Sequence, residues 1–288
     1  MKILLLGASG QLGFDLCRLF QNNECFDVSP LTRTDLDLMH IARIPEVLHQ
    51  YQFDILINCT AYNRVDDAQS HSQLAYAINT YAVEALAKYC AEVRAKFVHV
   101  SSDFVFNGEK TSPYTETDLV MPLSVYGTSK LLGELFAQQS HNDVLVIRTA
   151  SLFGEVGSSG KGGNCVEAFV HKARREEELR VINDITMSPT STADLAQAII
   201  SLLQQKAPSG IYHVVNDGVV TWYAFASEIM NQMRLSARMT PVSHAEFPMK
   251  ALRPRYSVLD TAKTANVIGK MPTWQEALHR YLQQKRYI

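Results

Sequence analysis

The sequence feature that decides the fold is Ile3-Leu4-Leu5-Leu6-Gly7-Ala8-Ser9-Gly10-Gln11-Leu12-Gly13, near the start of the chain. The apolar run predicts a buried strand, and the residues from Gln11 onward predict a helix. Gly7 permits a tight turn, Gly10 lets backbone N–H groups approach a phosphate, and Gly13 lets the helix pack on the strand. The helix N-terminus adds oriented donors and about half a positive charge. This order of elements indicates a site for the pyrophosphate of a dinucleotide.

Apolar runs and helical stretches alternate along the first half of the chain. Strands are expected at 3–6, 26–31, 54–58, 96–101 and 143–148, and helices at 11–21, 41–52, 72–94 and 124–139. The strands lack polar alternation, which indicates a parallel sheet covered by helices on both faces. We therefore predict an α/β fold with a Rossmann-like, doubly wound parallel sheet.

The second half of the chain is organised more loosely. The glycine-rich stretch 154–163 is expected to be a flexible loop. We expect residues 1–150 to form the NAD(P)-binding Rossmann domain, with a segment of about 179–215 returning to its sheet. Residues 151–288 are expected to form mainly a smaller C-terminal α/β lobe that binds the substrate.

Charge and cysteine content exclude several classes of protein. The net charge is -2 and the basic residues are dispersed, which argues against nucleic acid or an anionic membrane as a partner. The five cysteines show no CxxC spacing, as is usual in a reducing compartment. No apolar segment approaches the length that spans a bilayer. We therefore expect a cytoplasmic protein.

The end of the second strand carries the residues that would contact the adenosine ribose. Arg33 follows the strand directly, with Asp35 and Asp37 beyond it. An arginine here suits a 2′-phosphate, which slightly favours NADP over NAD. An exposed loop arginine is a nearly equal interpretation of Arg33, and Asp37 is better placed for the adenine edge than for the ribose.

Tyr126 and Lys130 lie one helical turn apart on the same face of a predicted helix. A tyrosine hydroxyl has a pKa near 10, and a nearby ammonium lowers it, which prepares the phenol to exchange a proton with a substrate oxygen. Ser102 and Asp103 follow the fourth strand, at the edge where open α/β sheets bind ligands. A second match, Tyr281-x-x-x-Lys285, has no companion motif and is interpreted as a surface pair. The serine, tyrosine and lysine together predict a hydride-transfer site.

Further motifs are spread over the whole chain. They are Asp35-Leu36-Asp37, Asn58-x-x-Ala61-Tyr62-x-x-Val65-Asp66, Ser101-Ser102-Asp103-Phe104-Val105-Phe106-x-Gly108, Tyr126-Gly127-x-Ser129-Lys130 and Arg253-Pro254-x-x-Ser257-x-Leu259-Asp260. With the glycine-rich loop, they resemble the dTDP-4-dehydrorhamnose reductase family, a branch of the extended short-chain dehydrogenases/reductases.

The resemblance implies that NADPH or NADH delivers a hydride to C4 of a nucleotide-linked 4-keto-6-deoxyhexose, in the first place dTDP-4-dehydro-L-rhamnose. It makes Tyr126 the proton donor and lets Lys130 lower its pKa and hold the nicotinamide ribose. Ser102 would orient the keto oxygen, and Asp103 would pass protons or steady the loop. The implied cofactor-binding residues are Gly7, Gly10, Gln11, Leu12, Gly13, Arg33, Asp37, Leu38, Ala61, Tyr62, Asn79, Tyr126 and Lys130. The implied substrate-binding residues are Val65, Asp66, Phe104, Ser151, Asn164 and Arg253.

The chain departs from the family pattern around the expected substrate. Ser102 replaces a threonine, Phe104 replaces a tyrosine, Ser151 replaces a tryptophan that stacks near the substrate, and Cys165 replaces a phenylalanine. These changes, with the serine, tyrosine and lysine in place, predict the same chemistry on a somewhat different or differently held sugar nucleotide.

No metal site is predicted. Some family members bind Mg²⁺ through glutamates at a dimer contact, but Asp15 stands at that position here. The histidines, His99 and His213 among them, show no ligand spacing and are interpreted as core or surface residues. The sequence leaves open whether the chain forms a homodimer.

Two alternative functions stay in competition with the reductase. A sugar-nucleotide epimerase on the same fold is expected to purify with tightly bound NAD. A related dehydratase needs an Asp-Glu pair, which Asp103-Phe104 does not supply. The third function is a non-catalytic NADP-binding subunit, because the regulatory subunit of methionine adenosyltransferase is similar to this family. The presence of both Tyr126 and Lys130 disfavours it.

Overall fold

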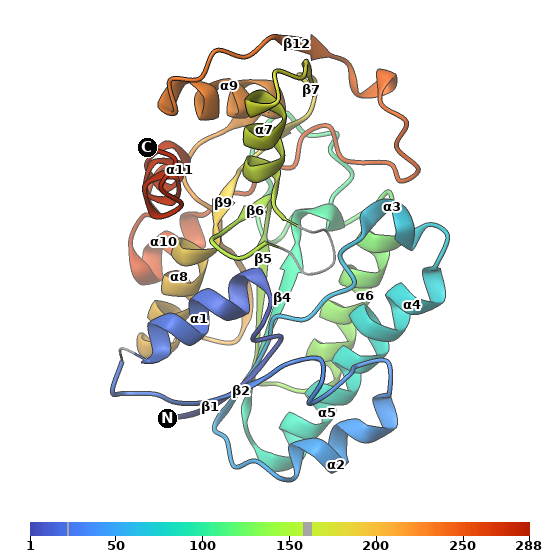
Figure 1. The fold of residues 1–288 in the computed structure, drawn as a ribbon. Coiled ribbons are helices and arrows are strands. Elements are labelled where there is room, and N and C mark those ends of the chain that lie inside the picture. The colour runs from blue at the N-terminus through green and yellow to red at the C-terminus, as the bar shows by residue number, and fades with distance from the viewer. Residues whose placement is uncertain (22, 158–162) are drawn as a thin grey trace.

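A six-stranded parallel sheet forms the larger part of the molecule in the computed structural model, which describes residues 1–21, 23–157 and 163–288 (Figure 1). The strand order is β10-β5-β4-β3-β1-β2. The strands are β1 (Lys2–Leu6), β2 (Asp27–Leu31), β3 (Ile55–Asn58), β4 (Lys96–Ser102), β5 (Val144–Thr149) and β10 (Gly210–His213). The chain reverses direction across the sheet between β1 and β3, which places a crevice for ligands at the carboxyl ends of these strands.

Helices cover both faces of this sheet because its strands are apolar on both sides. One face carries α1 (Gln11–Gln21), α8 (Thr192–Gln204) and α10 (Ala262–Ile268). The other carries α2 (Ile44–Leu48), α5 (Ala82–Val93) and α6 (Val125–Ser140). Each layer has its own buried cluster, around Leu16 and Ile199 on the first face and around Leu56 and Leu86 on the second. The predicted Rossmann-like α/β class is confirmed.

The helix expected at 72–94 is interrupted by a π-helical turn. It consists of α4 (Ser72–Tyr76), the π-turn η2 (Ala77–Tyr81) and α5, and it ends at Arg94, which has a φ of 58°. The turn carries Asn79 and Thr80, both fully buried, toward α6. The Thr80 hydroxyl donates a hydrogen bond of 2.8 Å to the backbone carbonyl of Ser129. The π-turn therefore anchors the helix that carries the expected catalytic pair.

The helix expected at 41–52 is shorter than predicted. It begins as a 3-10 turn, η1 (Ile41–Arg43), and continues as α2, where Pro45 lies in the first turn and needs no N–H partner. Further short elements border the sheet: α3 (Val65–Ala68) and η3 (Asp103–Val105).

The smaller lobe lies beyond the carboxyl edge of the sheet (Figure 1). Its elements are α7 (Cys165–Arg174), β7 (Leu179–Ile182), α9 (Trp222–Gln232), β12 (Met239–Val242), η4 (His244–Glu246) and α11 (Trp274–Gln284). Short strand pairs join it to the sheet domain: β6 (Leu152–Phe153) with β9 (Thr190–Ser191), and β8 (Thr186–Met187) with β11 (Val220–Thr221). The lobe has its own core around Phe225 and Trp274.

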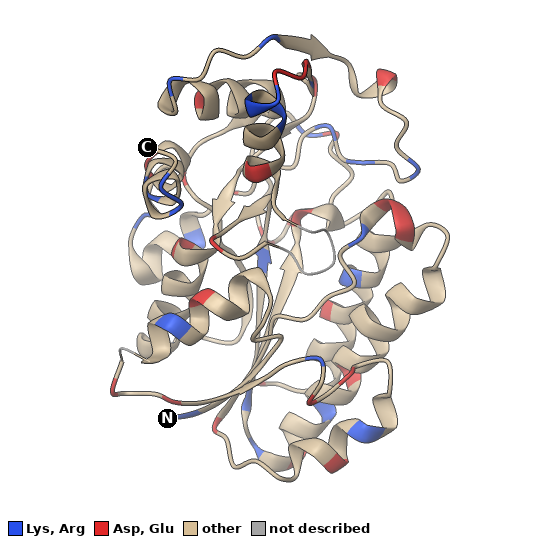
Figure 2. Ribbon diagram, viewed as in Figure 1, with Lys and Arg blue, Asp and Glu red and all other residues tan. Residues whose placement is uncertain are grey.

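The segment 179–215, expected to return to the sheet, divides between the two parts of the molecule. Strand β10 pairs with β5, and α8 packs beside α1, but β7 pairs with β12 in the lobe. The glycine-rich loop expected at 154–163 lies partly outside the described residues. Figure 2 shows acidic and basic residues interspersed over the helices of both parts. Within the described ranges, no helix has the length and apolar character needed to cross a membrane.

Candidate active site

The turn between β1 and α1 has the shape of a phosphate loop. Gly7 has a φ of +82°, and the N–H groups of Gly7 and Ala8 donate to the carbonyl of Leu31 at 2.9 and 3.1 Å. A Cβ at Gly13 would lie 2.1 Å from the Gly7 carbonyl oxygen, whereas one at Gly10 would lie 3.2 Å from it. The helix therefore approaches the strand as closely as only glycine allows.

The first turn of α1 fits the pyrophosphate of a dinucleotide. Its N–H groups have no intrahelical partners, so they are available to an anion. Among the described residues, the Gln11 side-chain oxygen is buried at this turn without a hydrogen-bond partner. The Leu12 side chain instead packs in the core between α1 and the sheet.

Arg33, Asp37 and Leu38 follow the end of β2. The Arg33 side chain is 78% exposed and forms an ion pair with Asp37, with 3.0 Å between Nη2 and Oδ2. The same carboxylate accepts a hydrogen bond of 3.0 Å from the Met39 backbone. Leu38 packs beside Ile44 in the core of the second face. The exposed guanidinium of Arg33 can therefore exchange the Asp37 carboxylate for a phosphate group of the cofactor.

Asn79 connects the segment after β3 to the catalytic helix. Its amide nitrogen donates to the Tyr62 carbonyl and to the Ser129 hydroxyl, both at 3.0 Å, and its oxygen accepts the Tyr62 N–H at 2.8 Å. The Tyr62 hydroxyl donates to Asp67 at 2.6 Å, and Ala61 is exposed beside it. The Asn79 side chain thus fixes the backbone of the segment expected to line the cofactor.

Ser102 and Tyr126 meet where β4 ends and α6 begins. The Ser102 hydroxyl donates to Asp103 Oδ1 at 3.0 Å, accepts the Phe104 N–H at 3.2 Å and is hydrogen-bonded to Tyr126. The Phe104 ring contacts the Tyr126 ring edge-on, with 5.5 Å between centroids. A Cβ at Gly127 would lie 2.3 Å from the Phe104 carbonyl oxygen, so glycine permits this close approach of α6 and the turn η3.

The protonation of Tyr126 differs from the sequence expectation. Burial raises the pKa of Tyr126 to about 12; the hydrogen bond between Ser102 and Tyr126 lowers it in part, and the charge of Asp103 raises it. Lys130, expected to lower this pKa, donates to the Val100 carbonyl at 2.6 Å and lies 3.3 Å from His99 Nε2. The ammonium is therefore directed at β4, and the phenol keeps its proton at neutral pH.

Lys130 is 1% exposed, and burial lowers its pKa to about 8, opposed by the charge of Glu134. Asp103 is also buried, and burial raises its pKa to about 6, opposed by hydrogen bonds from Ser257 and Ser102. Titratable groups with such shifts in a crevice are typical of active sites.

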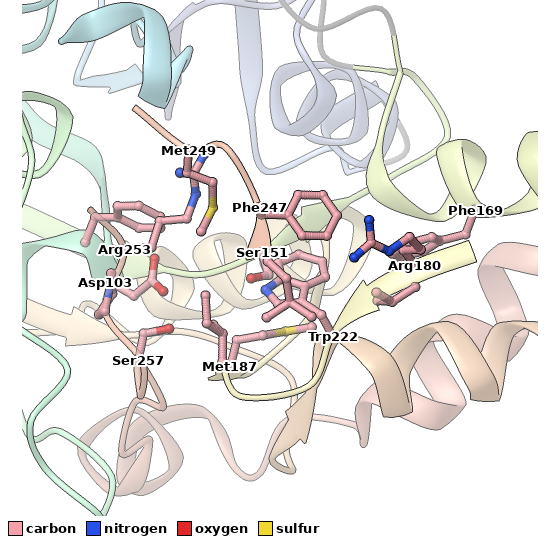
Figure 3. A pocket seen from close by; sticks show the side chains of 15 residues that line it. Asp103, Ser151, Phe169, Arg180, Met187, Trp222, Phe247, Met249, Arg253 and Ser257 are labelled. Carbon is pink, nitrogen blue, oxygen red and sulfur yellow. The ribbon is translucent and has the colours of Figure 1, made fainter. Parts of the chain in front are cut away.

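A cavity of about 260 Å³ opens beside these residues, between the sheet edge and the lobe (Figure 3). Its wall is mostly apolar, with Asp103, Ser257 and Arg253 at one end and Arg180 at the other (Figure 3), as in sites for small organic ligands. Three of the expected substrate residues line it: Phe104, Ser151 and Arg253. Ser151 has a φ of 45°, which directs its backbone out of the strand path.

Asp66 and Arg253 bind each other across the cleft. Arg253 Nη2 lies 2.6 Å from Asp66 Oδ2, and the Ala251 N–H donates to Asp66 Oδ1 at 2.9 Å. The guanidinium lowers the pKa of Asp66. Val65 opens α3 just before this carboxylate. The pair fastens the segment around residue 251 to the sheet domain.

Asn164 serves the lobe. Its oxygen caps α7 by accepting the Glu167 N–H at 3.0 Å, and its nitrogen donates to the Gly154 carbonyl at 2.9 Å and the Tyr281 hydroxyl at 3.0 Å. These bonds occupy the amide, and Asn164 does not line the cavity. Tyr281, interpreted from sequence as a surface residue, is buried in the lobe core.

Most of the cavity wall had no sequence signal. The additional lining residues come from five segments of the lobe: Phe169, Arg180, Met187, Trp222, Phe247 and Met249. They belong to no motif, and all of them except Arg180 are apolar, as core residues are. Among the described residues, no cluster of histidine, cysteine and acidic side chains has the geometry to hold a metal ion.

Comparisons with known proteins agree with this geometry. The family model described as the RmlD substrate binding domain matches residues 1–287. The spore coat polysaccharide biosynthesis protein SpsK of Bacillus subtilis is 37% identical over 284 residues, covering 99% of this chain and 98% of that protein. A dTDP-4-dehydrorhamnose reductase structure from Clostridium acetobutylicum has a TM-score of 0.93 at 33% identity, covering 99% of this chain and 100% of that one. A dTDP-4-dehydrorhamnose reductase from Bacillus anthracis, in complex with NADP, has a TM-score of 0.92 at 33% identity, covering 98% and 99%. The chain therefore belongs to the RmlD substrate binding domain family, that of the dTDP-4-dehydrorhamnose reductases.

Proposed function

We propose that this protein reduces dTDP-4-dehydro-L-rhamnose to dTDP-L-rhamnose with NADPH. The observation that carries the proposal is the contact between Ser102 and the protonated phenol of Tyr126, at the sheet edge beside the cavity. Family membership and the NADP complex of the Bacillus anthracis reductase support the same reaction.

The residues divide the chemistry between them. NADPH, when bound, would supply the hydride that reduces C4 of the sugar. Tyr126 gives its proton to the keto oxygen, which becomes a hydroxyl, and the high pKa of this phenol ensures that the proton is present. Ser102 donates a hydrogen bond that orients the same oxygen. The first turn of α1 and the exposed Arg33 hold the phosphates of the cofactor.

The cavity wall supports a sugar nucleotide held by aromatic rings. Ser151 stands where the resemblance predicts a tryptophan, but the wall includes Trp222, Phe247 and Phe169 on the lobe side (Figure 3). Arg180 and Arg253 supply cations at the same wall. This combination suits a base or sugar ring beside a diphosphate. A cytoplasmic location is part of the proposal, supported by cysteines that are scattered along the sequence without CxxC spacing.

The test is NADPH oxidation with dTDP-4-dehydro-L-rhamnose, followed by absorbance and by identification of the product. Tyr126→Phe should lower kcat by about 10²–10⁴-fold, the usual contribution of a general acid. Tyr281→Phe is the matched control, because Tyr281-x-x-x-Lys285 repeats the spacing in the lobe core, away from the cavity. Full activity of Tyr126→Phe, or no turnover of the keto sugar by the folded wild-type protein, would contradict the proposal.

A further inference from the structure

Two buried side chains, His99 and Asn58, connect Lys130 to the segment beside the phosphate loop. Lys130 Nζ lies 3.3 Å from His99 Nε2, and His99 Nδ1 lies 3.3 Å from Asn58 Nδ2. The Thr60 N–H donates to Asn58 Oδ1 at 3.0 Å. His99 and Asn58 have no exposed surface. A Cβ at Gly7 would meet the Thr60 methyl group at 3.0 Å, so the chain of contacts ends at the phosphate loop.

The orientation of the Asn58 amide follows from its partners. A backbone N–H can only donate, so the atom of Asn58 that faces Thr60 is the oxygen. The amide nitrogen of Asn58 therefore faces His99. Since this nitrogen also only donates, His99 Nδ1 must accept and carries no proton. A neutral imidazole has one N–H, which is then on Nε2.

The Nε2–H of His99 points at Lys130. An ammonium has three donors and no acceptor, so it would face the imidazole N–H donor against donor. An uncharged amine has a lone pair that accepts from Nε2–H, while one of its own N–H groups donates to the Val100 carbonyl at 2.6 Å. We propose that Asn58 fixes the tautomer of His99 with its proton on Nε2, and that this N–H disfavours the ammonium form of Lys130 relative to the uncharged amine.

The other groups around Lys130 are consistent with this role. Glu134 on α6 favours the charged form, but Arg148 and Ser101 bind its carboxylate, and Cys59 after β3 stays an uncharged thiol because burial raises its pKa. Burial acts in the same direction as His99 and lowers the pKa of Lys130 to about 8. Burial also keeps the pKa of His99 well below its usual range, so the ring stays neutral. His99 is thus a positioning residue, which acts on the reaction through Lys130.

The tautomer is measured directly by NMR of protein labelled with ¹⁵N-histidine, without any turnover. His141 is an internal reference, because its Nε2 lies 2.9 Å from the Ala95 carbonyl oxygen and must carry a proton. We expect His99 to show the same Nε2–H pattern as His141. A proton on Nδ1 of His99 in the wild-type protein would overturn the proposal. The consequence for catalysis rests on the proposed function, but this measurement does not, so the two fail separately.

Two variants of Asn58 separate the tautomer from simple charge effects. Asn58→Leu removes the donor without adding charge, and Asn58→Asp replaces it with an acceptor. Both should move the proton of His99 to Nδ1, and both should raise the pKa of Lys130, followed by NMR of ¹³C-labelled lysine, by about one unit or more. Thr60→Val is the control, because its backbone N–H still orients Asn58, and it should keep the wild-type tautomer. A shift in Asn58→Asp alone would reveal a charge effect and overturn the proposal, as would wild-type behaviour of both variants.

Discussion

Glu134 and Arg148 form a buried ion pair beneath the catalytic helix, with 2.7 Å between Arg148 Nη2 and Glu134 Oε2 and side-chain exposures of only 1% and 3%. Arg148 Nε adds bonds of 3.0 and 3.1 Å to the two carboxylate oxygens. The pair connects α6 to β5, and the Ser101 hydroxyl on β4 joins it. The position of Lys130, one turn earlier on α6, depends on this connection.

Removing one partner of this pair should be more harmful than removing both. Arg148→Met leaves the Glu134 carboxylate buried without its cation, and we expect a loss of about 3–5 kcal/mol in the free energy of unfolding. The double variant with Glu134→Leu should recover most of that loss, because an apolar pair fills the same space. Urea denaturation of the three proteins checks this. A double variant as unstable as Arg148→Met would show that the pair contributes more than charge compensation.

The phosphate loop predicts a graded response to alanine. Gly13→Ala places a Cβ 2.1 Å from the Gly7 carbonyl oxygen, so the loop must shift, whereas Gly10→Ala places one at 3.2 Å. Dissociation constants for NADPH, measured by fluorescence, should therefore rise at least about tenfold for Gly13→Ala. Gly10→Ala should bind more tightly than Gly13→Ala, and the reverse order would contradict the proposed geometry.

Arg33 should decide the preference between the two cofactors. Arg33→Ser removes the guanidinium that suits a 2′-phosphate, so KM for NADPH should rise by about tenfold or more while KM for NADH changes little. Arg43→Ser is the control, because it removes another arginine of the sheet domain, in the turn η1. It should alter neither KM. Equal effects of Arg33→Ser on both cofactors would assign it no role in discrimination.

The carboxyl of Asp103 should reduce stability at neutral pH. Its native pKa of about 6 lies above the ordinary value, so the native state binds its proton more tightly than the unfolded state does. The unfolding free energy therefore falls as the pH rises from about 4 to 6. Asp103→Asn should remove this slope and stabilise the protein at pH 7 by about 1–3 kcal/mol. Urea unfolding at both ends of the window measures it.

Asp118 is a control, because its pKa is shifted in the opposite direction to that of Asp103. The Lys110 ammonium lowers the pKa of Asp118 to about 2, so its contribution is present above about pH 4 and is lost as the pH falls toward 2. Asp118→Asn should not stabilise the protein at pH 7. If Asp103→Asn also failed to stabilise the protein at pH 7, burial of the charged Asp103 carboxylate would not have the expected free-energy cost.

The ion pair between Asp66 and Arg253 should affect substrate binding more than folding. Asp66→Asn removes the charge that holds Arg253 at the cavity wall, so KM for the sugar nucleotide should rise about three- to tenfold. The side chain of Asp66 is 41% exposed, and the loss of stability should stay below about 1 kcal/mol. Glu84→Gln, which removes an exposed ion pair with Lys88 on α5, should leave KM unchanged. An unchanged KM in Asp66→Asn would show that this ion pair has only a structural role.

The sequence was most informative where backbone geometry and local spacing determine the structure. Gly7 and Gly13 indicate a strand, turn and helix because side chains are excluded there, and the apolar runs place the parallel strands. The spacing of Tyr126 and Lys130 predicts one face of one helix, as the structure has it. The fold class and the sheet edge that carries the site therefore follow from local patterns.

The missing parts depend on long-range burial. The phenol of Tyr126 was expected to have a lowered pKa, but burial raises it, and burial cannot be inferred from a four-residue spacing. Trp222 and Phe247 look like core residues in the sequence and line the cavity only because the lobe folds over the sheet edge. The strand at β7 was expected near the sheet, but its partner β12 lies about 60 residues later, in a stretch without a clear pattern.

The π-helical turn at Ala77–Tyr81 has a consequence for how this helix tolerates insertions and deletions. A π-turn accommodates one residue more than a regular turn of α-helix. Deleting one residue there would restore regular α-helical geometry and leave α5 in nearly its present orientation relative to α4, because a π-turn rotates less per residue than an α-turn. The contacts of Leu86, Ala87 and Cys90 with the sheet would remain, whereas the bulge that carries Asn79 to Ser129 would be lost. The extra residue therefore serves the connection to the catalytic helix and not the packing of α5 on the sheet.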